Sequence, residues 1–258
     1  MRRFIIAGLA LGAPIVPVMA ADMPAYDKVP VPAFSWTGFY LGGDIGVATT
    51  TDNAQWNPTS TSAIPFGVSP AGSGTGGASF VGGVLAGYDW QFANAWVAGV
   101  EADWTGMKAG AAFTEAWLGS PGGGVVPGGF TSLSSELEWT ASVRARLGYL
   151  IAPRFLAYGT VGGAWGNFQY SASSINTVTG YAANAAFSDT KTGWVAGVGF
   201  EWAPFASLGL LLRAEYLNYG FGGAQITSAA NGFPAPPSGY SWSSPNVGMA
   251  RLAASYKF

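Results

Sequence analysis

Residues Glu136–Ile151 read ELEWTASVRARLGYLI, and apolar and polar side chains alternate along the stretch. The odd-numbered positions, from Leu137 to Ile151, are all apolar, whereas the even-numbered positions carry two glutamates and two arginines. Successive side chains of a β-strand point to opposite faces, so this pattern predicts one apolar face and one charged face. Strands of soluble domains average about five or six residues, and a tilted membrane-spanning strand needs about 9–11. The length of the stretch therefore favours a strand that crosses a membrane.

Related alternation recurs in seven other segments. The segment 155–170 has the weakest pattern, because only Asn167 and Gln169 mark its polar face. The seven segments are residues 39–47, 88–92, 100–105, 155–170, 191–202, 212–216 and 250–258. Together with the first stretch they predict eight strands.

The connections between these strands alternate between long and short. They are residues 50–78, 93–94, 109–135, 152–154, 171–188, 203–206 and 220–245. Antiparallel outer-membrane barrels have long extracellular loops and short periplasmic turns in this order. We therefore predict an all-β fold, an eight-stranded, up-and-down antiparallel transmembrane β-barrel with four long extracellular loops and both termini in the periplasm.

Composition supports a membrane barrel and excludes many enzymes. Only 9% of the 258 residues are charged, against roughly 25% in a typical soluble domain. The body of the chain contains no apolar run of about 18–20 residues, so a closed barrel remains as the structure that satisfies its backbone in lipid. The chain has no histidine and no cysteine, which excludes common zinc sites and Ser-His or Cys-His hydrolases. We expect no cofactor, no metal site and no enzymatic activity.

The first 20 residues have the three regions of a secretory signal peptide. Arg2 and Arg3 precede an apolar run, and the small-residue site at its end predicts cleavage between Ala20 and Ala21. A short membrane anchor is the alternative. Residues 21–35 are proline-rich and predict an extended periplasmic tail, which leaves residues 36–258 for the barrel. Loss of the two arginines leaves an acidic chain, and no basic patch suggests binding to nucleic acid.

Charged side chains gather on the polar faces of the predicted strands, which would line the barrel lumen. We predict a lumen ion-pair network of Asp44, Asp89, Glu101, Asp103, Glu138, Arg144, Arg146, Lys191, Glu201, Arg213, Glu215, Arg251 and Lys257. An eight-stranded barrel has an interior just wide enough for side chains to fill it, so opposite charges there are expected to pair. The favoured interpretation is a plugged barrel.

Two other interpretations of these charges remain open. Arg144, Arg146, Arg213 and Arg251 could line a narrow or gated pore. Glu101 and Asp103, two residues apart on one face, could in principle do acid-base chemistry, although ion pairing with the arginines is the simpler role. Conductance measurements distinguish the pore from the plugged barrel.

The end of the chain alternates up to an aromatic last residue. Tyr256 and Phe258 lie on the predicted apolar face of the last strand. This arrangement resembles the assembly signal of bacterial outer-membrane barrels, which implies that the barrel-assembly machinery is a partner.

Three sequence features resemble the small outer-membrane immunogenic proteins of alphaproteobacteria, often called porin-family proteins. They are AADMP at residues 20–24, WTGFYLGG at residues 36–43 and the terminal Tyr256-Lys257-Phe258. The resemblance implies an OmpA-type eight-stranded barrel without a periplasmic domain, in the outer membrane of a Gram-negative bacterium. It also implies contact with outer-membrane lipid and lipopolysaccharide, and covalent attachment to peptidoglycan at Ala21 and Asp22. A simple flexible leader is the alternative for these two residues.

Taken together, the sequence predicts a structural outer-membrane barrel and surface antigen. It would contribute to envelope integrity and interact with other surfaces through its extracellular loops. The alternative is a narrow or gated porin that passes small solutes through a lumen lined by Arg, Asp and Glu.

Overall fold

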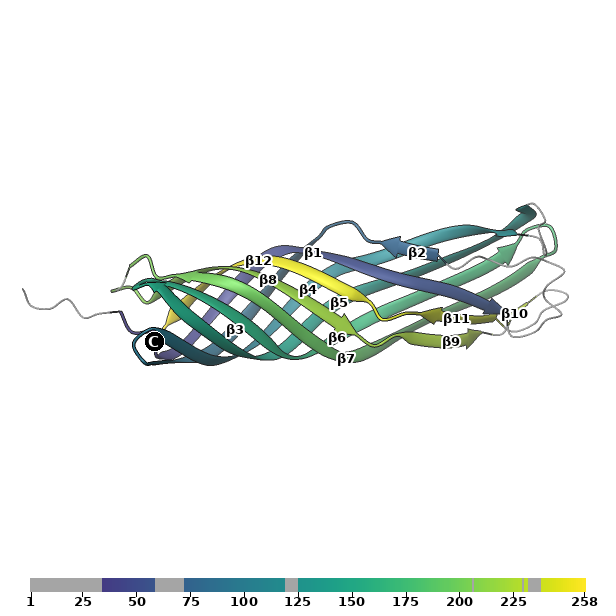
Figure 1. Ribbon diagram of the computed structural model, residues 1–258. Helices are drawn as coiled ribbons and strands as arrows, with labels where there is room; N and C mark the ends of the chain where they lie inside the picture. Colours follow the sequence, from purple (N-terminus) through teal and green to yellow (C-terminus); the bar gives the residue numbers. More distant parts are fainter. Residues whose placement is uncertain (1–33, 59–71, 119–124, 206, 229, 232–237) are drawn as a thin grey trace, which may run out of the picture. The chain divides into compact units, whose positions relative to one another are not determined.

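The computed structural model describes residues 34–58, 72–118, 125–205, 207–228, 230–231 and 238–258. They form β-strands joined by turns (Figure 1). The strands are β1 (Gly38–Pro58), β2 (Gly72–Thr75), β3 (Ser79–Phe92), β4 (Trp96–Leu118), β5 (Val125–Ala152), β6 (Phe155–Asn176), β7 (Tyr181–Trp202), β8 (Leu210–Phe221), β9 (Ala224–Ser228), β10 (Ala230–Asn231), β11 (Ser238–Trp242) and β12 (Asn246–Lys257). Within these described ranges, no helix is long and apolar enough to cross a bilayer.

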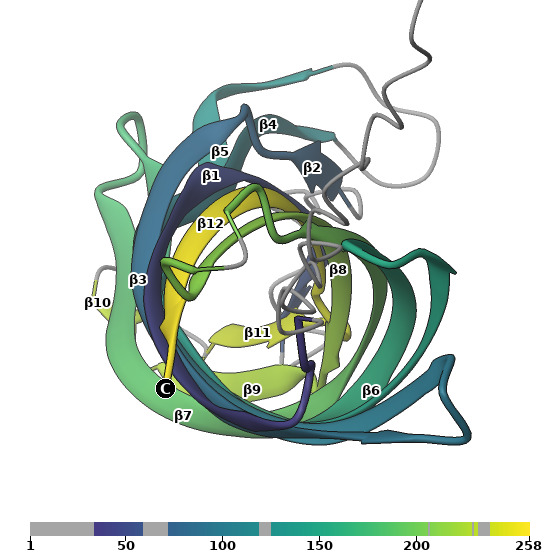
Figure 2. The same ribbon diagram turned by 90° about the vertical axis from the view of Figure 1, so that its left-hand side faces the viewer.

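Eight long strands form a closed antiparallel ring. The order is β1, β3, β4, β5, β6, β7, β8 and β12, and β12 pairs with β1 to close it. This closing register runs from Tyr40 opposite Lys257 to Thr51 opposite Asn246. Figure 2 shows the ring from one end. The predicted eight-stranded, up-and-down barrel is confirmed.

An apolar belt surrounds the part of the barrel nearest the described ends of the chain. Along β1 its side chains are Phe39, Leu41, Ile45 and Val47, all exposed on the outer wall. An aromatic row borders the belt on each side. The proximal row contains Trp90, Trp96, Tyr149, Trp202 and Tyr256, and the distal row contains Phe80, Trp104, Trp165 and Trp194. Two aromatic rows flanking an apolar band are typical of a barrel that spans a membrane.

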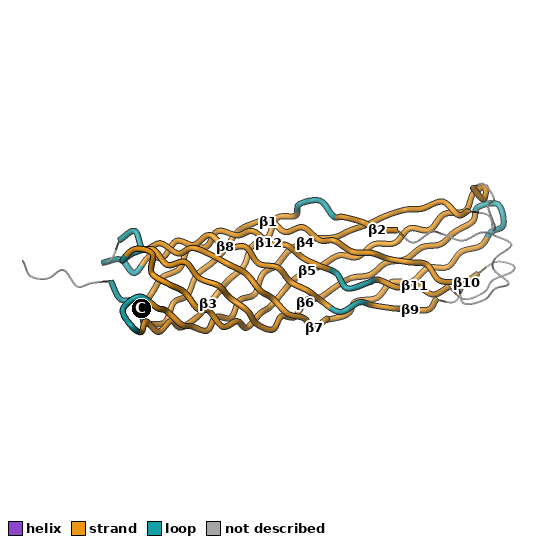
Figure 3. Tube along the Cα trace, in the orientation of Figure 1, coloured by secondary structure: helices purple, strands orange, loops and turns teal. Residues whose placement is uncertain are grey.

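Several strands continue past the distal aromatic row and form what we call the distal extension (Figure 3). It comprises residues 49–58, 107–118, 125–138, 166–176 and 181–193, together with β2, β9, β10 and β11. The prediction of long loops at 109–135 and 171–188 is wrong for most of these residues. Within 171–188, only residues 177–180 form a turn between strands.

An irregularity on β5 reverses which of its side chains face inward where the strand enters the distal extension, whereas on β4 the buried residues are odd-numbered throughout. The register shifts between Gly106 and Ala109 on β4, and between Leu137 and Trp139 on β5. A β-bulge adds one residue to a strand and so exchanges its two faces. Leu137, predicted to face outward, is therefore buried, whereas Glu136 is exposed.

The short turns at the proximal end lie close to their predicted positions. Turn residues occupy 93–95 and 153–154, and β8 begins at Leu210 after the break that follows Trp202. Ala93 and Asn94 have positive φ angles of 46° and 61°. Positive φ at both central residues is the requirement of the tight hairpin turn whose twist matches the strands.

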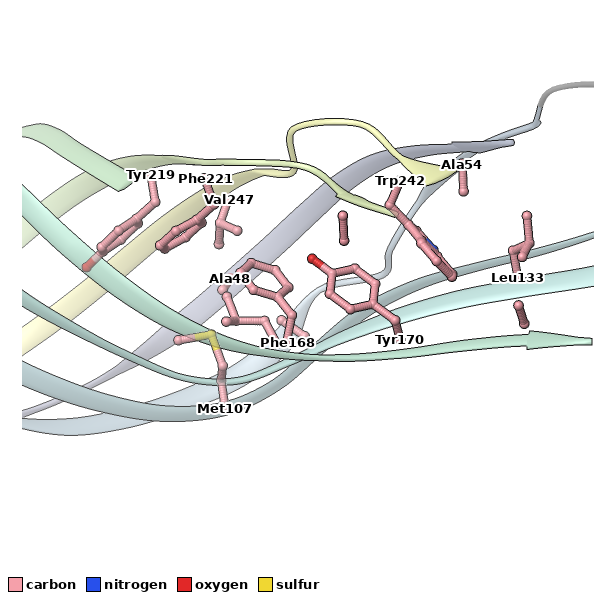
Figure 4. Packing of buried hydrophobic residues seen from close by; sticks show 14 of the residues in the cluster. Ala48, Ala54, Met107, Leu133, Phe168, Tyr170, Tyr219, Phe221, Trp242 and Val247 are labelled. Atoms are coloured by element: carbon pink, nitrogen blue, oxygen red, sulfur yellow. The ribbon is translucent and has the colours of Figure 1, made fainter. Parts of the chain in front are cut away.

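Two apolar clusters fill the lumen, one on each side of a charged layer. The proximal cluster contains Trp36, Tyr40, Leu85, Val97, Leu156, Tyr158, Ala203, Leu211 and Ala253. The second cluster lies on the distal side of the charged layer and reaches into the distal extension. Figure 4 shows Phe168, Tyr170, Tyr219 and Trp242 in it. Tyr170 and Tyr219 are 1% and 0% exposed and face the lumen.

Candidate functional site

The charged layer lies inside the apolar belt and has Glu101 of β4 near its centre. Arg144, on the neighbouring strand β5, is directly opposite Glu101 and forms an ion pair with it. Arg146 of β5 and Arg213 of β8 also contact the Glu101 carboxylate. Both side chains of the Glu101–Arg144 pair are 0% exposed. One carboxylate therefore joins arginines from opposite sides of the lumen.

Glu201 and Glu215 extend this network around the barrel. Arg146 Nη2 donates to Glu201 Oε2 at 2.7 Å, and Arg213 Nη2 donates to Glu201 Oε1 at 2.8 Å. Glu215 lies 3.1 Å from Arg144 Nη1 and 2.7 Å from Arg251 Nη2. Each of these glutamates thus bridges two guanidinium groups.

Three aspartates form the edge of the network. Asp103 Oδ2 is 2.7 Å from Arg144 Nη2 and accepts a hydrogen bond from the Ser142 hydroxyl at 2.8 Å. Asp44 is 3.4 Å from Arg251. Asp89 is 3.6 Å from Arg146. The contacts of Asp44 and Asp89 are longer than the central pairs, but they keep both carboxylates beside positive charge.

Two tyrosines, which the charge pattern alone does not reveal, complete the layer. Tyr40 donates from its hydroxyl to Glu101 Oε2 at 2.7 Å, and Tyr158 donates to Glu215 Oε1 at 2.9 Å. The Arg146 guanidinium lies over the Tyr158 ring, 4.2 Å from its centroid. The sequence could have indicated Tyr40, because it lies on the same face of β1 as the predicted lumen residue Asp44.

Three residues of the predicted network have other surroundings. Glu138 is half-buried next to the β5 irregularity and accepts a hydrogen bond from Gln169 at 2.6 Å. Lys191 pairs with Asp189 at 2.6 Å, in the part of β7 beyond the end of β8. Lys257 is 8% exposed, and its ammonium has no partner within hydrogen-bond distance in the described part of the chain. The prediction that Glu138 and Lys191 belong to the lumen network is wrong, and buried Lys257 forms no ion pair among the described residues.

The arginines and carboxylates of the layer depend on one another because they are buried. The four arginines are at most 4% exposed: Arg144, Arg146, Arg213 and Arg251. Moving an isolated charge out of water costs several kcal/mol, and removal of one partner from a buried pair typically costs about 3–5 kcal/mol. The layer therefore fills the lumen with side chains that hold one another in place.

The first described residues cover the proximal end of the lumen. Trp36 is 1% exposed, and its indole Nε1 donates to the Pro153 carbonyl of the β5–β6 turn at 3.4 Å. The backbone N–H of Trp36 donates to Gln91 Oε1 at 3.0 Å. Phe34 packs edge-on against Trp36, with ring centroids 5.1 Å apart. Three layers thus occupy the lumen: this apolar end, the charged layer and the distal aromatic cluster.

The other predicted sites lie at the two ends of the chain. Ala20, Ala21 and Asp22 fall outside the described residues. Tyr256 and Phe258 are exposed on the outer wall, with ring centroids 5.1 Å apart. The backbone N–H of Phe258 donates to the Phe39 carbonyl at 2.9 Å, so the last residue is still bonded to the first strand. The described residues include no group of three or more Asp or Glu side chains placed to hold a metal ion.

The closed ring, the apolar belt and the charged lumen together define an outer-membrane β-barrel protein. A family model described as an outer membrane protein beta-barrel domain matches residues 9–258, and the chain belongs to this family.

Named relatives include the 31 kDa outer-membrane immunogenic protein of Brucella melitensis. It is 32% identical over 274 residues, an alignment that covers 100% of both chains. The 22 kDa outer membrane protein of Rhizobium leguminosarum is 31% identical over 185 residues, which cover 72% of this chain and 64% of the relative. The predicted resemblance to outer-membrane immunogenic proteins is confirmed.

Two solved structures share the fold. The outer membrane protein OprG of Pseudomonas aeruginosa superposes with a TM-score of 0.52 at 12% identity, covering 86% of this chain and 97% of OprG. The outer membrane protease OmpT of Escherichia coli also has a TM-score of 0.52, at 8% identity, covering 89% of this chain and 99% of OmpT. At these identities the likeness extends to the fold alone.

Proposed function

We propose that the protein is a closed structural barrel of the outer membrane that contributes to envelope integrity and presents its distal end to the cell exterior. The observation that carries this proposal is the buried network that joins Glu101, Glu201 and Glu215 to four arginines across the lumen. Trp36 on one side of the network and the aromatic cluster on the other reinforce the closure. No catalytic role is part of the proposal.

Conductance in planar bilayers tests the closed lumen against the alternative of a narrow or gated porin. Purified wild-type protein is expected to give no stable openings, because the arginines are held by carboxylates rather than lining a water-filled channel. Lys191→Gln, which changes a cation outside the network, is the matched control and is expected to behave as wild type. Stable wild-type openings whose conductance changes in Arg144→Gln or Arg213→Gln would support the porin instead.

We further propose that both termini lie in the periplasm and that the distal extension is extracellular. The short turns at the proximal end and the long strand extensions at the other end support this orientation. A protease added to intact cells is expected to cut within residues 177–180, the exposed turn between β6 and β7, and to spare the proximal turns. Cleavage at residues 203–209 in intact cells would reverse the orientation.

Contacts with the envelope follow from the same proposal. The apolar belt would contact outer-membrane lipid, and the rim of the distal row would contact lipopolysaccharide. Ala21 and Asp22 would join the barrel to peptidoglycan, which predicts a muropeptide-linked peptide beginning at Ala21 in digested sacculi. Absence of this peptide would leave residues 21–35 as a simple leader.

The barrel-assembly machinery is the proposed partner of the last strand. Deletion of Phe258 removes the terminal aromatic ring and its backbone bond to Phe39. We expect less folded protein in the membrane, measured as loss of the heat-modifiable band on electrophoresis. Normal amounts of that band would argue against an assembly signal at Phe258.

A further inference from the structure

The distal extension contains a buried carboxylate with unusual surroundings. Asp52 of β1 is 3% exposed and lies on the inner face between Thr50 and Ala54, both of which are also buried. Neither of its carboxylate oxygens has a hydrogen-bond partner at normal distance. Among the described residues, no basic side chain forms an ion pair with Asp52, in contrast to Asp44 of the same strand, which lies beside Arg251. Asp52 is therefore a buried acid without a balancing charge.

Three aromatic rings face the same part of the lumen. Tyr170 of β6, Phe187 of β7 and Trp242 of β11 contact one another, with centroid distances of 4.9 Å, 5.0 Å and 5.8 Å. Tyr170 and Trp242 are 1% and 3% exposed. The Tyr170 hydroxyl and the Trp242 indole Nε1 have no hydrogen-bond partner. Figure 4 shows the two rings close to each other, with Ala54 beside Trp242.

Strand register places Asp52 beside these rings. Trp242 pairs with Ala54, which is the next inward position along β1 from Asp52. Tyr170 pairs with Ser135, whose side chain is near enough to Asp52 to stabilise the carboxylate. Burial raises the pKa of Tyr170, and the negative charges of Asp52 and Asp189 raise it further. Two separate observations thus bring the carboxylate and the aromatic rings together.

The chemistry of these groups selects a positively charged organic molecule. The faces of Trp and Tyr rings attract cations, and a carboxylate adds charge and hydrogen-bond acceptors. Hard metal ions require about six oxygen ligands, which one carboxylate surrounded by rings does not provide. An anion would be repelled by Asp52. We propose that Asp52, Tyr170, Phe187 and Trp242 form a binding site for a small organic ammonium ion in the distal extension.

Calorimetric titration of the folded full-length barrel in detergent micelles tests this proposal. The probes are choline and phenethylammonium, and 2-phenylethanol serves as the neutral analogue of the second. We expect at least one of the two ammonium ions to bind saturably. If phenethylammonium binds, 2-phenylethanol is expected to bind at least tenfold more weakly. Failure of both ammonium ions to bind would overturn the proposal.

Variants locate the site. Asp52→Asn is expected to weaken ammonium binding at least tenfold, and Trp242→Leu is expected to weaken it as well. Glu136→Gln is the matched control, because Glu136 is an exposed carboxylate on the outer wall of the same extension. The heat-modifiable band shows that each variant is folded. Wild-type affinity in folded Asp52→Asn, or an equal loss in Glu136→Gln, would contradict the assignment.

Discussion

The polar and apolar faces of the strands are exchanged between the part of the barrel inside the apolar belt and the distal extension. Within the belt the outer wall is apolar, and the lumen holds Glu101, Arg144 and their partners. In the distal extension the lumen is filled by Phe168, Trp242 and neighbouring rings, and the outer wall carries Thr51, Glu136 and other polar side chains. The outer face of a barrel must match the medium around it, lipid in one region and water in the other. Side chains therefore alternate between the two faces in both regions, but the inner face is charged within the belt and apolar in the distal extension.

The largest expected difference between the regions comes from removing a lumen charge. Arg144→Leu leaves Glu101 and Glu215 each without one of its buried partners. We expect a loss of about 3–5 kcal/mol in the free energy of unfolding, measured by urea titration in micelles. In the distal extension, Lys191→Leu breaks a partly exposed pair and should cost about 0–1 kcal/mol. Equal losses would show that the charged layer does not stabilise the barrel.

A matched pair of alanines on the outer wall tests the two media. Ala145 of β5 is exposed within the apolar belt, and Ala112 of β4 is exposed on the outer wall of the distal extension. Arginine at a lipid-facing position near the bilayer midplane costs about 2–4 kcal/mol, so Ala145→Arg should lower the free energy of unfolding by about this amount in lipid vesicles. Ala112→Arg should change it by less than about 0.5 kcal/mol. A large loss in the free energy of unfolding for Ala112→Arg would indicate that lipid surrounds the distal extension.

Asp52 gives a smaller effect whose sign depends on pH. Burial raises the pKa of Asp52 to about 6 from its ordinary value of 3.8. The folded barrel therefore binds this proton more tightly than the unfolded chain, and ionised Asp52 destabilises the fold at neutral pH. Asp52→Asn should raise the free energy of unfolding by about 1–3 kcal/mol at pH 8 and by almost nothing at pH 4.

Urea titrations of Asp52→Asn and wild type across this pH range provide the check. The difference between the two proteins should grow between pH 4 and pH 6 and then level off. A difference that stays constant with pH would mean that the carboxylate has similar surroundings in the folded and unfolded chain.

A small effect is also expected at the edge between the two regions. Glu138 accepts a hydrogen bond from Gln169 in a partly exposed position rather than an arginine contact in the lumen. Glu138→Gln should therefore change the free energy of unfolding by less than about 1 kcal/mol. The same substitution at Glu101 should cost several times more, since Glu101 contacts four arginines. Similar losses in the free energy of unfolding at the two positions would indicate that Glu138 belongs to the lumen network.

The sequence was sufficient to predict the ring and most of the charged layer, because lipid imposes strict alternation on the belt. The predicted parity of β5 holds from Thr140 to Gly148, where even-numbered residues are buried. It fails at Leu137, because one extra residue in the strand exchanges its two faces. The alternation of apolar and polar residues in the sequence does not show where such an extra residue lies.

The distal strands were predicted as loops for a related reason. Beyond the belt the apolar side chains face inward, and many positions are Gly, Ala, Ser or Thr, which gives weak contrast between the two faces. The site around Asp52 depends on contacts between β1, β5, β6 and β11, and no spacing in the sequence indicates which distant residues meet there.

A scan of nitroxide spin labels along β5 tests the reversal of faces most directly. The chain has no cysteine, so single cysteines placed at each position from Thr131 to Leu147 can be labelled in the folded barrel in lipid vesicles. Collision with oxygen reports lipid, and collision with a water-soluble nickel complex reports water. We predict oxygen-accessible labels at odd positions from Trp139 to Leu147 and nickel-accessible labels at even positions from Ser132 to Glu136. Accessible odd positions continuing through Leu137 to Thr131 would contradict the account.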